Sequence, residues 1–203
     1  KDWLDSIKAP LTTRSDAAGG CDGIKNGSYG FHIGHEPNPW WQVDLGSTEA
    51  IGRIVIYNRL DYEPGLHNAD GMRMYSSLDG KTWALFHDNQ GHHFGGIRGA
   101  PPLEVTFDAP GLAARFIRLA ISNDSPIFFH LDEVEVYAAG NDAANIALGK
   151  PADQSSLSPW STVKVRDSLD YPIAAQIGRG RRFAAFLEAQ GIKTSDLLEQ
   201  LDE

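Results

Sequence analysis

The histidines are the first residues of this chain whose types and spacing could do chemistry. His87, His92 and His93 lie close together in the sequence, and His35 precedes them. Imidazole nitrogens bind transition metals, so such a group could form a metal site. A structural zinc site normally adds thiolates or carboxylates at a set spacing, and no such pattern accompanies these histidines. We therefore interpret them as solvated loop residues.

Motifs of known catalytic sites are absent from the sequence. It contains no Gly-x-Ser-x-Gly elbow, no phosphate-binding loop and no His-Glu-x-x-His motif. Carboxylates are plentiful, but no spacing pairs two of them as acid and base. Cys21 lies beside Asp22 in a glycine-rich loop, and a nucleophile there would need a positioned base. The sequence therefore predicts a protein that is not an enzyme.

The Trp40-Trp41 pair is suited by type to stack on a sugar, because aromatic faces fit the C–H surface of a sugar ring. Successive residues of a strand point to opposite faces, so both rings could not contact one ligand. Large aromatic side chains are also buried on average. The pair is therefore predicted to have a structural role.

The elements that must position any site are short strands separated by turn residues. Strand-like runs occupy 40–45, 51–57, 72–76, 83–87, 103–107, 115–121 and 131–136. Asp79-Gly80 is a tight-turn signal between the third and fourth of these runs. Many short strands at near-regular spacing, with little helix, predict an all-β sandwich or barrel.

The composition changes after Gly140, which divides the chain into a β-sandwich over 1–139 and a tail over 140–203. Asn141-Asp142 is typical of a linker, and residues 145–160 are strand-like and turn-like. We expect 145–156 to fold back and pair with an exposed edge of the sandwich. The period of residues 174–202 is that of helix, which would pack outside the sandwich or mediate self-association.

Five fragments, in this order along the chain, carry a resemblance to a known family. They are Cys21-Asp22-Gly23, the run from Phe31 to Gly46 with its Trp-Trp-Gln-Val-Asp-Leu core, Asn58-Arg59-Leu60-Asp61, Ser76 to Trp83, and Leu131 to Tyr137. Over residues 15–139 the chain resembles the discoidin (coagulation-factor C-type) superfamily, and within it the F-type, fucose-binding lectins and related carbohydrate-binding modules. The resemblance implies an all-β, discoidin-like jelly-roll β-sandwich with ligand loops at one end, here followed by a partly helical C-terminal extension.

The resemblance also implies a sugar site. In F-type lectins a histidine before the paired tryptophans and an arginine after the asparagine hold the sugar hydroxyls, and His32 and Arg59 stand at these places. Ring and guanidinium N–H groups donate well to hydroxyl and ring oxygens. The alternatives are an ion pair of Arg59 with Asp61 that holds the loop, and a loop role for His32.

Two departures from the family pattern bear on the ligand more than on the fold. The third sugar-binding arginine of the family falls at Leu66 here, and its adjacent-cysteine pair is replaced by Tyr62-Glu63. We expect His67 or Arg73 to supply the missing donor.

A calcium ion near the ligand loops is a further implication of the resemblance. Ca²⁺ takes six to eight oxygen ligands, largely carboxylate and carbonyl. Asp22 and Glu133 match the carboxylate ligands of the family. The other expected ligands are Gly19, Ile24, Ser28 and Asp132. The alternative is that Asp22 caps a turn and Glu133 faces solvent.

The net charge of −9 disfavours nucleic acid and anionic membrane as partners. No apolar run has the length of a membrane span, although Phe128-Phe129 could form an apolar tip for membrane attachment. The sequence thus predicts a non-catalytic carbohydrate-binding module that recognises a neutral glycan, with fucosylated glycans and an extracellular or cell-surface setting implied by the resemblance. The alternatives are a structural or protein-interaction discoidin domain, or the recognition module of a larger carbohydrate-active enzyme.

Overall fold

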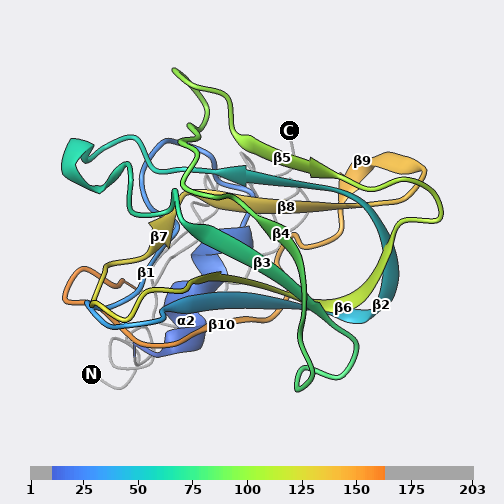
Figure 1. The fold of residues 1–203 in the computed structure, drawn as a ribbon, viewed down its shortest axis with the longest axis horizontal. Helices are drawn as coiled ribbons and strands as arrows, with labels where there is room; N and C mark the ends of the chain where they lie inside the picture. Colours follow the sequence, from blue (N-terminus) through green and yellow to red (C-terminus); the bar gives the residue numbers. More distant parts are fainter. Residues whose placement is uncertain (1–10, 163–203) are drawn as a thin grey trace, which may run out of the picture. The chain divides into compact units, whose positions relative to one another are not determined.

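A computed structural model describes residues 11–162 of the chain (Figure 1). These residues fall in the first of two compact units, Lys1–Lys164. The helix expected over 174–202, and the self-association expected of it, lie outside the described residues. Within 11–162, no helix has the length and apolar character needed to cross a membrane.

Antiparallel strands make up most of the described elements, as predicted. One short α-helix, α2 (Thr13–Ala17), and two 3₁₀ turns, η1 (Ala18–Cys21) and η2 (Glu63–Gly65), accompany them within 11–162. The strands are β1 (Phe31–His32), β2 (Trp40–Tyr57), β3 (Met72–Ser77), β4 (Ala84–Asp88), β5 (Leu103–Thr106), β6 (Leu112–Ile121), β7 (His130–Leu131), β8 (Glu133–Ala138), β9 (Asn141–Asn145) and β10 (Ala152–Gln154).

The long strand β2 belongs to both layers of the sandwich. Its first part, 40–44, pairs with β6 on one side and with β10 on the other. Its last part, 53–57, pairs with β5 and β8. The register shifts between Asp44 and Glu49 and again between Ile51 and Arg53, and at these irregularities the strand bends from one layer into the other (Figure 1). The runs predicted at 40–45 and 51–57 are therefore one bent strand.

The two layers enclose a continuous apolar core. One layer has the order β10-β2-β6-β3-β4, and the other has the order β9-β8-β2-β5. Large side chains from both layers are almost completely buried: Trp41, Val43, Ile54, Ile56, Met72, Met74, Ile117, Leu119, Val134 and Val136. Burying one such side chain stabilises a fold by about 1.5–3 kcal/mol. The predicted all-β, discoidin-type sandwich is confirmed.

The Trp40-Trp41 pair has the structural role predicted for it. Trp41 is fully buried, its indole N–H donates to the carbonyl of Ala17 (2.9 Å), and its ring stacks on Phe31 with centroids 5.6 Å apart. Trp40, on the opposite face of β2, is half-buried beneath the guanidinium of Arg118, 4.5 Å from its ring centre. The two rings therefore do not share a ligand.

Residues after Gly140 complete the sandwich. β9 forms a hairpin with β8, and β10 pairs antiparallel with β2, with Ala152 opposite Val43 and Gln154 opposite Trp41. The predicted return of 145–156 to the sandwich edge is confirmed. The sandwich continues past the boundary predicted at residue 139, and Asn141-Asp142 lies in a strand rather than in a linker. Composition misled the prediction, because a polar, exposed edge strand has the same residue types as a linker.

Candidate ligand-binding site

Two short strands at one end of the sandwich bring two histidines together. β1 and β7 pair antiparallel, with His32 directly opposite His130. Residues opposite each other in such a pair have side chains on the same face. Accordingly, the two imidazole rings lie with centroids 4.9 Å apart, and both residues are buried.

Asp16 fixes the backbone at His32 and ties it to the C-terminal segment. This carboxylate is fully buried and accepts hydrogen bonds from the N–H of His32 (2.9 Å) and the N–H of Thr162 (3.0 Å). It also accepts from the side chains of Gln154 (2.9 Å) and Ser161 (3.0 Å). A buried carboxylate requires such donors, so the segment after β10 is held against β1.

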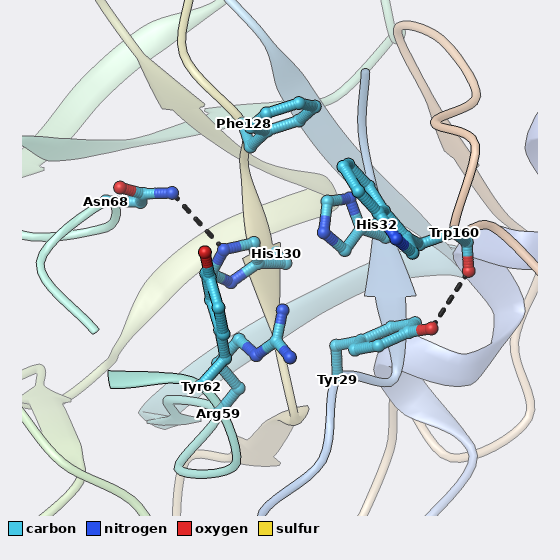
Figure 2. Close-up of a pocket in the computed structure, with 8 residues that line it drawn as sticks. All are labelled: Tyr29, His32, Arg59, Tyr62, Asn68, Phe128, His130 and Trp160. Carbon is cyan, nitrogen blue, oxygen red and sulfur yellow. Dashed lines mark hydrogen bonds between the residues drawn. The ribbon is translucent and has the colours of Figure 1, made fainter. Parts of the chain in front are cut away.

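A pocket of about 220 Å³ opens at this end of the sandwich (Figure 2). Its walls combine four aromatic rings with two imidazoles, one guanidinium and one amide. The residues that line it are Tyr29, His32, Arg59, Tyr62, Asn68, Phe128, His130 and Trp160. The predicted pair of His32 and Arg59 is thus brought together, in a concave site of the kind that binds small ligands.

Arg59 lies between two tyrosine rings of this pocket (Figure 2). Its guanidinium carbon is 4.8 Å from the ring centre of Tyr29 and 5.4 Å from that of Tyr62. Its Nε–H donates to Asp61 (2.6 Å), which is the ion pair predicted as the alternative role. Burial raises the pKa of Asp61, but the hydrogen bond and charge of Arg59 outweigh this effect, and the net pKa is lowered. The ion pair fixes the guanidinium while its other N–H groups remain available to a ligand.

His130 presents a neutral ring to the pocket. Burial, together with the charges of Arg59 and His32, lowers the pKa of His130 to about 3, so the ring is uncharged at neutral pH. Its Nε2 lies 3.3 Å from the amide nitrogen of Asn68, and its buried Nδ1 has no hydrogen-bond partner within the described residues. A neutral imidazole has one donor and one acceptor nitrogen, which suits an uncharged ligand rich in hydroxyl groups.

Six of the pocket residues were not predicted as ligand contacts: Tyr29, Tyr62, Asn68, Phe128, His130 and Trp160. A signal existed for Tyr62, which stands where the family has its cysteine pair.

Phe128 and Phe129 do not form a membrane tip, because Phe129 is fully buried in the core and Phe128 packs on His32 (5.6 Å) and Trp160 (5.3 Å). No motif in the sequence indicated that Trp160 lines the pocket.

The donors expected to replace the family's third arginine lie outside the pocket. Arg73 is opposite Asp88 in the pairing of β3 with β4, and its Nε–H donates to that carboxylate (2.8 Å). The ring of His67 is mostly exposed and lies 2.7 Å from Asp70. Leu66 does not line the pocket, and its carbonyl accepts a hydrogen bond from the side chain of Asn58. Asn68 and His130 are the further polar residues that do line the pocket.

A second group of predicted residues forms an acidic cluster, in which Asp132 and Glu133 are buried and Asp22 is half-buried. Glu133 is fully buried, so the alternative in which it faces solvent is wrong. Its Oε1 accepts from the N–H of Gly23 (3.0 Å), while its buried Oε2 has no hydrogen-bond partner among the described residues. Burial and the charge of Asp22 raise the pKa of Glu133 to about 9, and burial raises that of Asp132 to about 6.

The acidic cluster fits a hard cation. An unpartnered oxygen on a buried carboxyl is costly, and a bound cation removes that cost. The carbonyls of Gly19 and Asp132 converge on Gly30, where each would lie 2.2 Å from an added Cβ. Asp22 also accepts from the N–H of Ile24 (2.8 Å), which is the turn-capping role predicted as the alternative.

One predicted calcium ligand is directed elsewhere. The hydroxyl of Ser28 hydrogen-bonds to Asp61, the partner of Arg59, and so belongs to the pocket side of the loop. The preceding residue, Gly27, donates its N–H to Asp132 of the acidic cluster (2.8 Å), so neighbouring residues of this loop bond to different sites. Carboxylate and carbonyl oxygens at Gly19, Asp22, Ile24, Asp132 and Glu133 remain as the candidate set.

The two-layered sandwich with a pocket among its end loops defines a discoidin-type binding domain. The family description F5/8 type C domain matches residues 11–133. The chain belongs to the F5/8 type C domain family. A search of curated proteins found no match.

Solved structures similar to this chain include lectins and carbohydrate-binding modules. The lectin domain of lectinolysin, solved with Lewis B antigen, is 31% identical with a TM-score of 0.47, over 60% of this chain and 83% of that one. A fucose-binding module of Streptococcus pneumoniae, SpX-3, is 24% identical (TM-score 0.47, 64% and 90% covered). The F-lectin of striped bass (Morone saxatilis) serum is 22% identical (TM-score 0.49, 64% and 44% covered).

Proposed function

We propose that this chain is a non-catalytic carbohydrate-binding module that holds a neutral glycan in the pocket between Arg59 and Trp160. The observation that carries the proposal is the position of Arg59. Its guanidinium is fixed between Tyr29 and Tyr62 by the ion pair with Asp61, inside a pocket that also contains two imidazoles. Charged N–H donors beside aromatic faces suit the alternating hydroxyl and C–H surfaces of a sugar.

The charges of the site favour an uncharged sugar over an acidic one. Asp61 already balances the charge of Arg59, and His130 is neutral. An anionic sugar would therefore meet no unpaired cation from these two residues. The volume of about 220 Å³ is below the ~300–1,000 Å³ typical of drug-sized ligand sites, which favours a terminal sugar unit over an extended chain.

Fucosylated glycans are the first ligands to test within this class. The similar lectin domain of lectinolysin is described in complex with Lewis B antigen, and the similar pneumococcal module is described as fucose-binding. By the resemblance, His32 and Arg59 match two sugar-binding positions of F-type lectins, and both line the pocket together with His130 and Asn68.

A calcium ion bound at the acidic cluster would stabilise the loop that leads into the pocket. The side chains of Asp22 and Glu133, with the carbonyls of Gly19, Ile24 and Asp132, would hold the ion through oxygen atoms. The bound charge would compensate the buried carboxyls and tie the 19–28 loop to the start of β8. That loop leads directly into Tyr29, a wall of the pocket.

A glycan array probed with the full chain, with calcium and with chelator, tests the proposal. Removing a charged hydrogen bond costs about 1.5–3 kcal/mol, so Arg59→Ala should lower the affinity for the selected glycan about tenfold or more. Arg73→Ala is the matched control, because Arg73 is paired with Asp88 outside the pocket. Equal binding by wild type and Arg59→Ala would contradict the sugar site. Failure to bind any glycan would favour the protein-interaction alternative.

A further inference from the structure

A cluster of three metal-ligating side chains lies outside both sites described above. His67, Asp70 and His93 place one ligand atom each within 4.8 Å of one another. The Nδ1 atoms of His67 and His93 lie 2.7 Å and 3.1 Å from the two oxygens of Asp70, and the imidazole rings are 4.5 Å apart. Of the four histidines considered for a metal site from the sequence, only His93 belongs to this cluster.

Two asparagines hold the cluster's two segments together from beneath. Asn58, fully buried, donates from its amide nitrogen to the carbonyls of Leu66 (2.7 Å) and Phe94 (3.2 Å), the residues that precede His67 and follow His93. The two histidines are therefore fixed side by side by one buried side chain.

The second asparagine, Asn89, holds the backbone of Asp70 in the same way. Asn89, almost completely buried, donates from its amide nitrogen to the carbonyls of Asp70 (2.8 Å) and His92 (2.6 Å). The N–H of Gly91 also donates to the carbonyl of Asp70 (3.1 Å). The backbone that carries all three side chains is thus organised before any ligand binds, which lowers the entropic cost of binding.

We propose that His67, Asp70 and His93 form an open binding site for a divalent transition-metal ion of the zinc type. Two imidazole nitrogens and one carboxylate oxygen match the ligand preference of such ions, whereas calcium prefers oxygen alone. With metal–ligand bonds of about 2.0–2.1 Å, ligand atoms in a tetrahedral site lie about 3.3 Å apart. The 2.7 Å between His67 Nδ1 and one Asp70 oxygen would need to open slightly, while the His93 ligand atom already lies within 4.8 Å of the other two.

The exposure of the cluster makes the site an open one. The side chains of His67 and His93 are 70% and 38% exposed, while that of Asp70 is 15% exposed. Three protein ligands leave a fourth position of a tetrahedral ion to water or to an exogenous group. The site shares no residue with the acidic cluster or with the residues that line the sugar pocket.

The test is a zinc titration of the full chain, prepared without a polyhistidine tag, stripped with chelator and assayed in calcium-containing buffer by isothermal titration calorimetry. Wild type should bind one Zn²⁺ per chain, and His67→Ala and His93→Ala should each lower that affinity tenfold or more. His92→Ala is the matched control, because this exposed histidine adjoins His93 but lies outside the cluster. It should bind zinc as wild type does.

Two further variants locate the ion. Asp70→Asn keeps the shape of the side chain and the turn, so it should fold normally and still lose zinc affinity. Asp22→Ala, in the acidic cluster, should leave zinc binding unchanged. No saturable zinc binding by wild type, undiminished binding by the folded His93→Ala and Asp70→Asn variants, or loss of binding in Asp22→Ala would each overturn the proposal.

Discussion

The acidic cluster and the ligand pocket lie in one domain but are assembled in different ways. The candidate cation ligands come from two short stretches, 19–24 and 132–133, and the first is shaped by local hydrogen bonds such as that from Ile24 to Asp22. The pocket takes its walls from five separate stretches, ending with Trp160. The candidate cation ligands thus come from two short motifs that the fold brings together, whereas the candidate sugar pocket needs five stretches, including one near the end of the described residues.

The C-terminal stretch distinguishes the two regions most clearly. Trp160 lies outside residues 11–133, which the family description matches, yet its carbonyl accepts from the hydroxyl of Tyr29 (2.9 Å) across the pocket (Figure 2). Asp16 binds the same stretch through Ser161 and Thr162. We therefore expect truncation or substitution after residue 140 to impair ligand binding in the pocket. Substitution near residue 22 should instead impair binding of the cation.

The largest effect is expected from truncation after Gly140. The fragment loses β9 and β10, exposes the edge of β2 and leaves Asp16 without three of its four hydrogen-bond donors. Each buried group left unsatisfied costs about 1–3 kcal/mol, against a typical total stability of about 5–15 kcal/mol. We expect no cooperative urea unfolding for this fragment and a normal transition for a control that ends at Lys164. A stable 1–140 fragment would show that the tail is a separate appendage.

Asp16→Ala probes the same connection with one side chain. The change leaves the buried backbone N–H of His32 without its acceptor, whereas Gln154 and Ser161 keep the carbonyls of Ser156 and His32. We expect a loss of about 1–3 kcal/mol in the free energy of unfolding, from one unsatisfied buried group. Urea denaturation measures it, and a loss below 1 kcal/mol would mean that the link between β1 and the C-terminal stretch is not stabilising.

Calcium should act on the other region. If Asp22 and Glu133 bind the ion, calcium at a hundred times its Kd stabilises the native state by about 2.7 kcal/mol, which raises Tm by about 5–10 °C. Asp22→Ala should abolish the difference between melting curves recorded with calcium and with chelator. The exposed Asp124 provides a control, since Asp124→Ala should keep the difference. Identical melting temperatures of wild type in both conditions would show that the acidic cluster does not bind calcium.

Trp160→Ala should have the smallest effect, and one confined to the pocket. Its side chain is 53% exposed, so little stability is expected to be lost. An aromatic wall contributes about 0.5–1.5 kcal/mol, so affinity for the glycan should fall about two- to tenfold while the calcium-dependent rise in Tm is retained. Titration calorimetry on Trp160→Ala and Trp160→Phe checks this, with Phe restoring most of the affinity. Unchanged affinity in Trp160→Ala would place the sugar elsewhere.

Much of the fold could be predicted from the sequence because its signals are local. Alternating apolar residues and the Asp79-Gly80 turn located β3 and β4 closely, and the opposite facing of Trp40 and Trp41 follows from strand geometry. The bend in β2 could not be predicted in this way, since it depends on pairing partners far along the chain. The polar strand β9 was predicted as a linker for another reason, because an exposed edge strand has the same residue types as a linker.

The candidate site residues also differ in whether a nearby motif could identify them. Asp22 and Glu133 followed from short motifs, and so did His32 and Arg59. Trp160 could not be found, because its place in the pocket is set by the pairing of β10 with β2 and not by any nearby motif. Ser28 was predicted for the wrong site, since its hydroxyl bonds to Asp61 while the neighbouring Gly27 bonds to Asp132.

The most direct test of the proposed sugar site is a crystal structure of the chain with the glycan selected on the array. We expect one sugar ring inside the pocket, with a hydroxyl hydrogen-bonded to the guanidinium of Arg59 and an apolar face against Trp160 or Tyr29. A glycan bound at another surface, with the pocket unchanged and empty of sugar, would contradict it.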